Sequence, residues 1–147
     1  MLLLAEQEIL IQRPVAEVFA YATNMENYGQ WFPGVVEIVS HNALPHGEIG
    51  KQYVETLKLP LGKTRLQLEV KQVEPNRLFA TEGDLKIMLP MMKMTFVTKA
   101  SAACLFHLSY FSRNPKLGEK HLVTRLLRAD LGRRIVIAMQ QLKHQLE

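Results

Sequence analysis

The stretch Gln12–Ile38, which reads QRPVAEVFAYATNMENYGQWFPGVVEI, changes its local pattern repeatedly and decides the fold. It overlaps the end of a strand-like run over residues 4–12, and Pro14 then suits the first turn of a helix, where its missing N–H costs nothing. The apolar residues that come next recur at helical spacing and form one face: Val15, Val18, Phe19 and Ala22. The stretch therefore predicts a strand that leads directly into a short amphipathic helix.

A second short helix is predicted directly after the first. Thr23 and Glu26 have the spacing of a capping box, in which the two side chains satisfy free backbone N–H groups at a helix start. The residues that would form its inner side are Met25, Tyr28 and Trp31. Pro33-Gly34 then ends the helix, and the chain resumes as a strand.

The chain from there to residue 112 alternates between strand patterns and turns. Strands are predicted over residues 35–41, 51–59, 64–73, 77–83, 91–100 and 104–112. Turns between them are indicated by Leu61-Gly62-Lys63, by Pro75-Asn76 and by the weaker Ser101-Ala102-Ala103. Consecutive strands with short connections imply an antiparallel sheet, so the helices must share its one covered face.

The last element, residues 119–147, has the pattern of a long helix. Its apolar residues recur at three- and four-residue steps: Val123, Leu127, Leu131, Ile135, Ala138, Leu142 and Leu146. Such a helix is roughly 40 Å long, which is enough to cross a whole sheet. We therefore predict one α+β domain, residues 1–147, in which a strongly curved antiparallel sheet of about seven strands wraps around the C-terminal helix. A gap would remain between these two layers.

Composition excludes several classes of protein. Hydrophobic residues make up 48% and charged residues 22% of the 147, which predicts a folded chain rather than a disordered one. The net charge is +4, but the Lys and Arg residues are scattered, so we expect no nucleic acid partner. The single cysteine, Cys104, rules out an internal disulfide.

No metal or cofactor is predicted. The histidines show no ligand spacing for zinc, and the chain has neither a glycine-rich phosphate loop nor a Gly-x-Ser-x-Gly nucleophile motif. The start, MLLLAEQEIL, lacks the basic leader and long apolar core of a signal peptide. No apolar run approaches the roughly 20 residues of a membrane span, so we expect a cytoplasmic protein without a transmembrane segment.

Four segments carry a family resemblance: RPVAEVFAYATNMENYGQWFPGV, HGEIGKQY, VEPNRLFATEG and a final helix introduced by NPKLGE. Together they span nearly the whole chain and resemble the SRPBCC superfamily of START domains, plant pathogenesis-related allergens and polyketide cyclase/dehydrase-like proteins. One departure is the last hairpin turn, which reads Ser101-Ala102-Ala103-Cys104 where the superfamily usually has a Gly-Gly-Thr-like signal. The resemblance implies a helix-grip fold, but members bind or convert very different molecules.

A cavity between the sheet and the long helix would be lined by side chains of both. From strand alternation and helix spacing, the predicted lining residues are Leu66, Leu68, Phe96, Phe106, Leu108, Tyr110, Ile135, Met139 and Leu142. Trp31, the one tryptophan, fits either core packing or the cavity wall, where its indole would supply apolar area and an N–H donor.

The strand over residues 51–59 has two possible orientations, and the strand over 78–83 is also ambiguous. Two sets compete for the inner face of the first: Tyr53, Glu55 and Leu57, or Val54 and Thr56. If it faces inward, Glu55 becomes an acid or base with a raised pKa, because burial disfavours the charged form. Tyr53, Glu55 and Tyr110 are thus candidates for proton transfer. The alternatives are a glutamate on a wet face and tyrosines bonded to backbone or water.

The segment LKIMLPMMKM, residues 85–94, holds four of the seven methionines and is apolar on both faces. Pro90 within it disfavours a central strand. The methionines Met88, Met91 and Met92 fit three interpretations, because methionine adapts to variable apolar shapes. They could be core filler, a flexible cavity mouth, or a patch that meets a partner or makes transient contact with a lipid surface.

Three functions remain open on this reasoning. The first is binding or transport of a small hydrophobic molecule such as a lipid, an isoprenoid quinone or an aromatic polyketide. The second is a polyketide cyclase/dehydratase-like enzyme, in which the cavity folds a reactive chain and a tyrosine or Glu55 moves a proton. The third is a protein-interaction module that uses the Met-rich segment 85–94. Binding ranks first because the sequence compels no acid/base pair.

Overall fold

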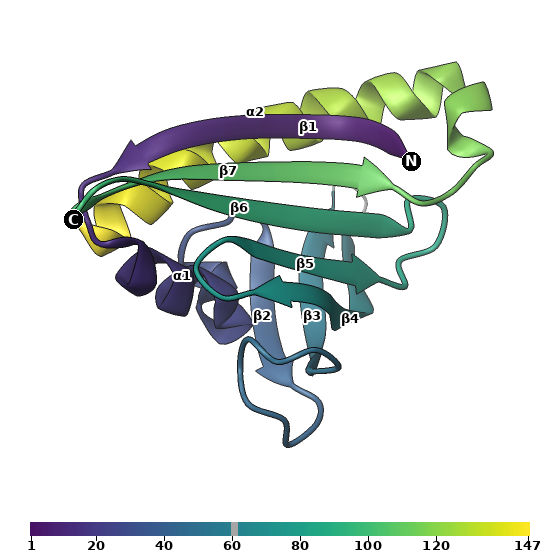
Figure 1. Ribbon diagram of the computed structural model, residues 1–147. Coiled ribbons are helices and arrows are strands. Elements are labelled where there is room, and N and C mark those ends of the chain that lie inside the picture. Colours follow the sequence, from purple (N-terminus) through teal and green to yellow (C-terminus); the bar gives the residue numbers. More distant parts are fainter. Residues whose placement is uncertain (60–61) are drawn as a thin grey trace.

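The computed structural model describes residues 1–59 and 62–147. Within these residues, seven antiparallel strands form one sheet in the order β1-β7-β6-β5-β4-β3-β2 (Figure 1). The strands are β1 (Leu2–Ile11), β2 (Val35–Ser40), β3 (Gln52–Leu59), β4 (Gly62–Glu74), β5 (Leu78–Gly83), β6 (Pro90–Ala100) and β7 (Ala103–Ser112). The predicted turn Leu61-Gly62-Lys63 includes Leu61, which lies outside the described residues.

Four helical segments accompany the sheet: α1 (Val15–Thr23), the 3-10 helices η1 (Met25–Gln30) and η2 (Leu117–Glu119), and α2 (His121–Leu146). The chain passes from one sheet edge, β1, through α1 and η1 to the opposite edge, β2, and the later strands then follow in sequence back to β7 beside β1 (Figure 1). This is the helix-grip fold that the sequence predicts. The predicted final helix over 119–147 is shorter at its start, because residues 117–119 form the separate turn η2.

The opening stretch folds as two helical segments, but its capping differs from the prediction. Val18 and Ala22 of α1 are buried, as their spacing predicts. The predicted capping box between Thr23 and Glu26 does not form, because the Thr23 hydroxyl donates to the carbonyl of Phe19 at 2.7 Å. Asn24 caps η1 instead, and its Oδ1 accepts a hydrogen bond from the backbone N–H of Glu26 at 3.1 Å.

Gly34 ends this stretch at a point that only glycine suits. Its φ of +91° lies in the left-handed region, where other residues are strained. A Cβ at this position would also overlap the guanidinium of Arg134 on α2. The Trp-Phe-Pro-Gly turn therefore brings the start of β2 into direct contact with the long helix.

The inner face of the sheet is set by the alternation of its strands. On β3, Tyr53 and Glu55 are buried while Val54 and Thr56 are only half-buried, so the first of the two possible orientations is the observed one. On β4, the predicted Leu66, Leu68 and Val70 are buried. Pro90 is compatible with the central strand β6 because it is the first residue of that strand.

Helix α2 is fastened along the edge strand β1. The Arg128 guanidinium donates to the carbonyl of Leu3 at 3.0 and 3.2 Å, and the Lys143 ammonium donates to the carbonyl of Leu10 at 3.0 Å. The buried residues of the helix are Thr124, Leu131, Ile135, Ala138, Met139 and Leu142. Because both ends of the contact are held by the backbone of β1, the helix has a fixed position over the sheet.

Candidate functional site: a cavity between the sheet and the long helix

A cavity of about 280 Å³ lies between the inner face of the sheet, the loop 84–89 and the first half of α2. Most of its wall is apolar. The apolar residues that the strands contribute include Leu57, Leu66, Leu68 and Met92, and those from α2 are Val123, Leu127 and Leu131. Such a space between two layers is the kind of site in which proteins hold small hydrophobic ligands.

Glu55 is a buried carboxyl group in the wall of this cavity. Its side chain comes from β3 and only 5% of the residue is exposed. Burial raises the pKa of Glu55 to about 7, and the positive charge of Arg134 offsets part of this rise. Among the described residues, no side chain or backbone group forms a hydrogen bond or ion pair with the Glu55 carboxyl. The cavity thus contains an acid that exchanges its proton near neutral pH and has no partner in the described part of the chain.

Two tyrosine hydroxyl groups lie in the same cavity. Tyr28 from η1 and Tyr110 from β7 are both buried, and their hydroxyls are hydrogen-bonded to each other. Burial raises the pKa of Tyr28 and of Tyr110 well above the ordinary value, and the nearby Glu55 adds to both shifts. Both phenols are therefore neutral at physiological pH. Since one hydroxyl donates to the other, one proton of the pair is left to donate elsewhere.

Arg134 and Asp130 of α2 also line the cavity, but they are already paired. Nε of Arg134 lies 3.0 Å from Oδ2 of Asp130, whose other oxygen lies 2.7 Å from Arg133. The remaining nitrogens of Arg134 donate to the carbonyls of Pro33 at 3.3 Å and Lys58 at 3.1 Å. The guanidinium thus ties α2 to the Trp-Phe-Pro-Gly turn and to β3.

The loop 84–89 forms one side of the cavity and has a strained backbone. Ile87 and Leu89 have φ values of 72° and 41°, in a region that β-branched residues such as isoleucine rarely adopt. Residues at the end of β7 and just after it hold the loop there: Ser112 Oγ donates to the carbonyl of Met88 at 2.6 Å, and the Asn114 amide donates to that of Ile87 at 2.7 Å. Ile87 lines the cavity and is 56% exposed, so this loop borders both the cavity and the solvent. Strain of this kind often marks functional segments.

The residues predicted to line a cavity fall into two groups. Leu66, Leu68 and Tyr110 line the observed cavity. The others lie in tightly packed core, which we call the packed region: Trp31, Phe96, Phe106, Leu108, Ile135, Met139 and Leu142. Aromatic rings fill this part of the molecule, since the ring centroids of Phe96 and Phe106 are 5.3 Å apart and those of Trp31 and Phe106 are 6.2 Å apart. Strand alternation identifies the inner face but does not indicate which part of it the helices fill.

The Met-rich segment is distributed between the cavity and the core. Met88 and Met92 line the cavity, whereas Met91 does not and Met94 is fully buried in the core. Because Met88 is half-buried and the other three are buried, the segment presents no exposed methionine patch to a partner protein.

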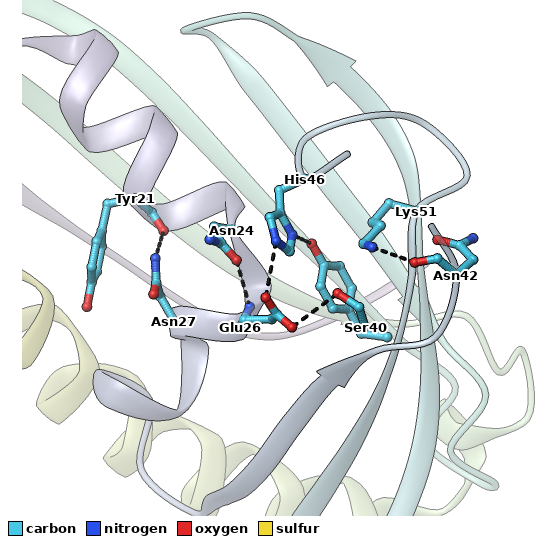
Figure 2. A network of polar contacts seen from close by, with 9 residues as sticks. Tyr21, Asn24, Glu26, Asn27, Ser40, Asn42, His46 and Lys51 are labelled. Atoms are coloured by element: carbon cyan, nitrogen blue, oxygen red, sulfur yellow. Dashed lines mark hydrogen bonds and ion pairs between the residues drawn. The ribbon is translucent and has the colours of Figure 1, made fainter. Parts of the chain in front are cut away.

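Tyr53 faces inward, but its hydroxyl belongs to a separate network, of which His46, Glu26 and Ser40 are labelled in Figure 2. The hydroxyl lies 2.6 Å from Nδ1 of His46, whose Nε2 lies 3.2 Å from a carboxylate oxygen of Glu26. Ser40 donates to the other Glu26 oxygen at 3.2 Å. Burial is the main cause that raises the pKa of Tyr53 to about 12. This tyrosine fastens the 41–51 loop to η1, and it does not reach the cavity.

The sequence analysis did not predict several of the residues that line the cavity. Thr81 and Gly83 come from the strand whose orientation was ambiguous, and Val123, Leu127 and Leu131 were recognised only as helix-face residues. Tyr28 was placed on the inner side of its helix, but its contact with Tyr110 joins residues 82 positions apart. Nothing in the local pattern indicates a contact at that separation.

The family is established by comparison with known proteins. Residues 4–147 match the model of the family described as "Polyketide cyclase / dehydrase and lipid transport". The chain belongs to this family, which confirms the resemblance to the SRPBCC superfamily. No curated protein matches the chain significantly. Among the described residues, no helix has both the length and the apolar composition needed to span a bilayer.

Solved structures share the fold at low sequence identity. The chain is similar to the aromatase/cyclase ZhuI from a Streptomyces species, with a TM-score of 0.73, 12% identity, and coverage of 97% of this chain and 92% of that one. It is also similar to a Thermus thermophilus protein, with a TM-score of 0.70, 14% identity, and coverage of 97% and 95%.

A third similar structure is the di-domain aromatase/cyclase StfQ of the steffimycin biosynthetic pathway, with a TM-score of 0.72 and 13% identity. The match covers 99% of this chain but only 51% of StfQ, so this chain spans about half the length of that protein. At these identities, the three likenesses show a common fold.

Proposed function

We propose that this protein binds one small hydrophobic molecule in the cavity between the sheet and α2. The observation that carries the proposal is an apolar cavity of about 280 Å³ that contains a buried carboxyl group with no hydrogen-bond partner among residues 1–59 and 62–147. Buried polar groups are normally hydrogen-bonded, and one without a protein partner is satisfied by water or by a ligand. Family membership supports the same function, since the family includes lipid transport proteins.

The volume limits the size of the ligand. Pockets for drug-sized ligands are roughly 300–1,000 Å³, so this cavity lies at the lower end of that range. A single acyl chain, one isoprenoid chain or a compact ring system fits such a space better than a lipid with two long chains. We therefore expect a lipid-like, quinone-like or polyketide-like molecule with one apolar body.

Native mass spectrometry of the purified, unheated protein tests this function. We expect a bound apolar molecule, or uptake of an uncharged fluorescent probe such as N-phenylnaphthylamine. Leu66→Trp should abolish uptake, because the larger ring would occupy the cavity. Val97→Trp is the matched control, since Val97 is exposed and lies outside the cavity lining. Probe uptake that is equal in both folded variants would contradict binding at this site.

An enzyme of the cyclase/dehydratase kind is the second candidate, and one observation favours it. A carboxyl group with a pKa near 7 lies in the same cavity as two tyrosine hydroxyls. That combination is suited to general acid–base catalysis, because a group that titrates near the working pH both accepts and donates protons. Turnover of a poly-β-keto substrate that is lost in Glu55→Gln and Tyr110→Phe, while ligand uptake persists, would establish this activity.

A further inference from the structure

The polar groups of the cavity indicate which kind of ligand it accepts. Glu55, Tyr28 and Tyr110 are buried side chains from three different elements that line one otherwise apolar space. The two hydroxyls are bonded to each other and retain one free proton, while the Glu55 carboxyl has no partner among the described residues. The apolar wall surrounds a small polar cluster, so a ligand that fills the cavity must place some group against that cluster.

The charges that face Glu55 nearly cancel one another. Helix α2 contributes Arg134 and Asp130, which are paired at 3.0 Å. Tyr28 on η1 and Tyr110 on β7 are neutral, because burial raises the pKa of each. Thr81 on β5 is uncharged, and Lys86 belongs to the exposed part of the loop 84–89. No unpaired cation of the described residues therefore lies beside Glu55 to receive a negatively charged ligand group.

On the basis of the proposed function, we propose that the ligand is an uncharged amphiphile whose buried end carries a carbonyl oxygen, and that Glu55 and the tyrosine pair hold this oxygen. Ketones, quinones and esters have such a group. The protonated carboxyl and the free tyrosine proton both donate to the carbonyl oxygen, which can accept two hydrogen bonds. The apolar body of the ligand then lies against the leucines of β4 and α2.

The same geometry excludes anionic head groups from the buried end. A fatty acid that entered head first would place a second carboxylate next to Glu55 and near Asp130, away from water. Two like charges in a buried site disfavour each other strongly, and one would have to bind a proton. A free fatty acid is therefore a poor ligand in this orientation, although its chain matches the apolar wall.

Binding of a carbonyl ligand should weaken as the pH rises. The ionised carboxylate has no proton to donate, and it would face the lone pairs of the carbonyl oxygen. Because the pKa of Glu55 is about 7, the donor form is lost between mildly acidic and mildly basic pH. Linkage then predicts a fall in affinity of up to roughly 30-fold between about pH 6 and about pH 8.5.

The experiment compares three probes of one chain length: a long-chain methyl ketone, the corresponding alkane and the corresponding fatty acid. Each displaces N-phenylnaphthylamine from the intact protein at both pH values. We expect the ketone to bind most tightly and to lose affinity as the pH rises, while the alkane is insensitive to pH. Glu55→Gln should remove the pH dependence, and Glu37→Gln is the matched control, because Glu37 is exposed on β2 and outside the cavity lining.

The outcomes separate this inference from the function on which it rests. Equal affinity for ketone and alkane, or a pH dependence that persists in Glu55→Gln, would overturn the inference and leave apolar binding intact. Tighter binding of the fatty acid than of the ketone at the higher pH would also overturn it. If no probe binds at either pH, both proposals fail. Should Glu55→Gln not fold, the double variant Tyr28→Phe/Tyr110→Phe provides a second test, because it removes both hydroxyls and with them the free proton, and it should lower the affinity for the ketone but not for the alkane.

Discussion

The packed region and the cavity lie under the same sheet, yet one is filled and the other is hollow. In the packed region, Phe106 of β7 packs against Trp31 and against Phe96 of β6, and Phe19 of α1 adds a further ring whose centroid is 5.0 Å from that of Phe96. In the cavity, the wall opposite the strands is formed mainly by α2, which contributes no aromatic ring but Val123, Leu127, Leu131, Asp130 and Arg134. The difference teaches that the hollow lies where α2 contributes no aromatic ring opposite the sheet, and the aromatic part of its wall is supplied by Tyr28, Phe32 and Tyr110.

The polar groups on the inner face of β3 show a similar contrast. On the inner face of β3, Tyr53 and Glu55 are two residues apart, but only Tyr53 has a partner for its polar group, at 2.6 Å on His46. Glu55 faces the cavity, and no described residue bonds to its carboxyl group. A structural role accounts for the tyrosine, whereas the buried glutamate lowers stability above its pKa, and the proposed ligand would supply its partner.

The largest expected effect is a difference in stability loss when a leucine is replaced by alanine in the packed region and in the cavity wall. Leu108→Ala in the packed region should lower the free energy of unfolding by about 4 kcal/mol, because it leaves a new void in close-packed core. Leu68→Ala should cost about 2 kcal/mol, because Leu68 already borders empty space. Urea denaturation monitored by circular dichroism measures both. Equal losses of unfolding free energy would show that the packed region and the cavity wall are packed alike.

The second prediction concerns the pH dependence of stability. The pKa of Glu55 in the folded protein, about 7, exceeds its ordinary value of 4.5, so the folded state binds this proton more tightly than the unfolded state. The raised pKa therefore does not lower the free energy of unfolding below about pH 4.5. The loss of stability grows as the pH rises and is complete above about pH 7. At about pH 8, Glu55→Gln should be more stable relative to wild type than at about pH 4.5, by on the order of 3 kcal/mol.

Chemical denaturation of both proteins across this pH range measures that difference. Glu37→Gln, at an exposed position, should follow the wild type throughout. Parallel curves for wild type and Glu55→Gln would mean that Glu55 has an ordinary pKa and is not desolvated by the cavity wall.

The third prediction tests the contact that holds α2 beside the cavity. Gly34→Ala should destabilise the protein by about 2 kcal/mol, because alanine is strained at φ +91° and its Cβ would displace the guanidinium of Arg134. Gly29→Ala is the control, since a Cβ there would meet Val35 at an ordinary 3.5 Å. Thermal unfolding of the two variants measures the difference, and indistinguishable melting temperatures would refute the role assigned to Gly34.

The smallest effect is expected within α2 itself. Gly132→Ala should stabilise the protein by about 1 kcal/mol, because glycine weakens a helix interior and nothing lies within 4 Å of the added Cβ. It should leave ligand affinity unchanged. A loss of probe binding in this variant would instead indicate that a ligand approaches the helix backbone at this glycine.

Most of the fold could be predicted from the sequence because it depends on local patterns. Alternation identified the strands and the inner positions of β4, and the Pro-Gly breaks delimited the helices. The orientation of β3 could not be predicted, because Tyr53 and Glu55 are not apolar and their burial depends on tertiary partners. Of the predicted lining, Leu66, Leu68 and Tyr110 border the cavity, but which part of the sheet is filled depends on how Phe19 and Trp31 pack. That packing joins residues far apart in the chain.

The most direct test of the account is methyl NMR of the protein titrated with an uncharged apolar ketone. The account predicts chemical-shift changes at methyl groups of the cavity wall, such as Leu66, Leu68 and Leu131, and none at Leu108 or Leu142 in the packed region. Changes confined to the packed region, or no change at saturating ketone, would contradict the claim that the space beneath α2 holds an apolar ligand.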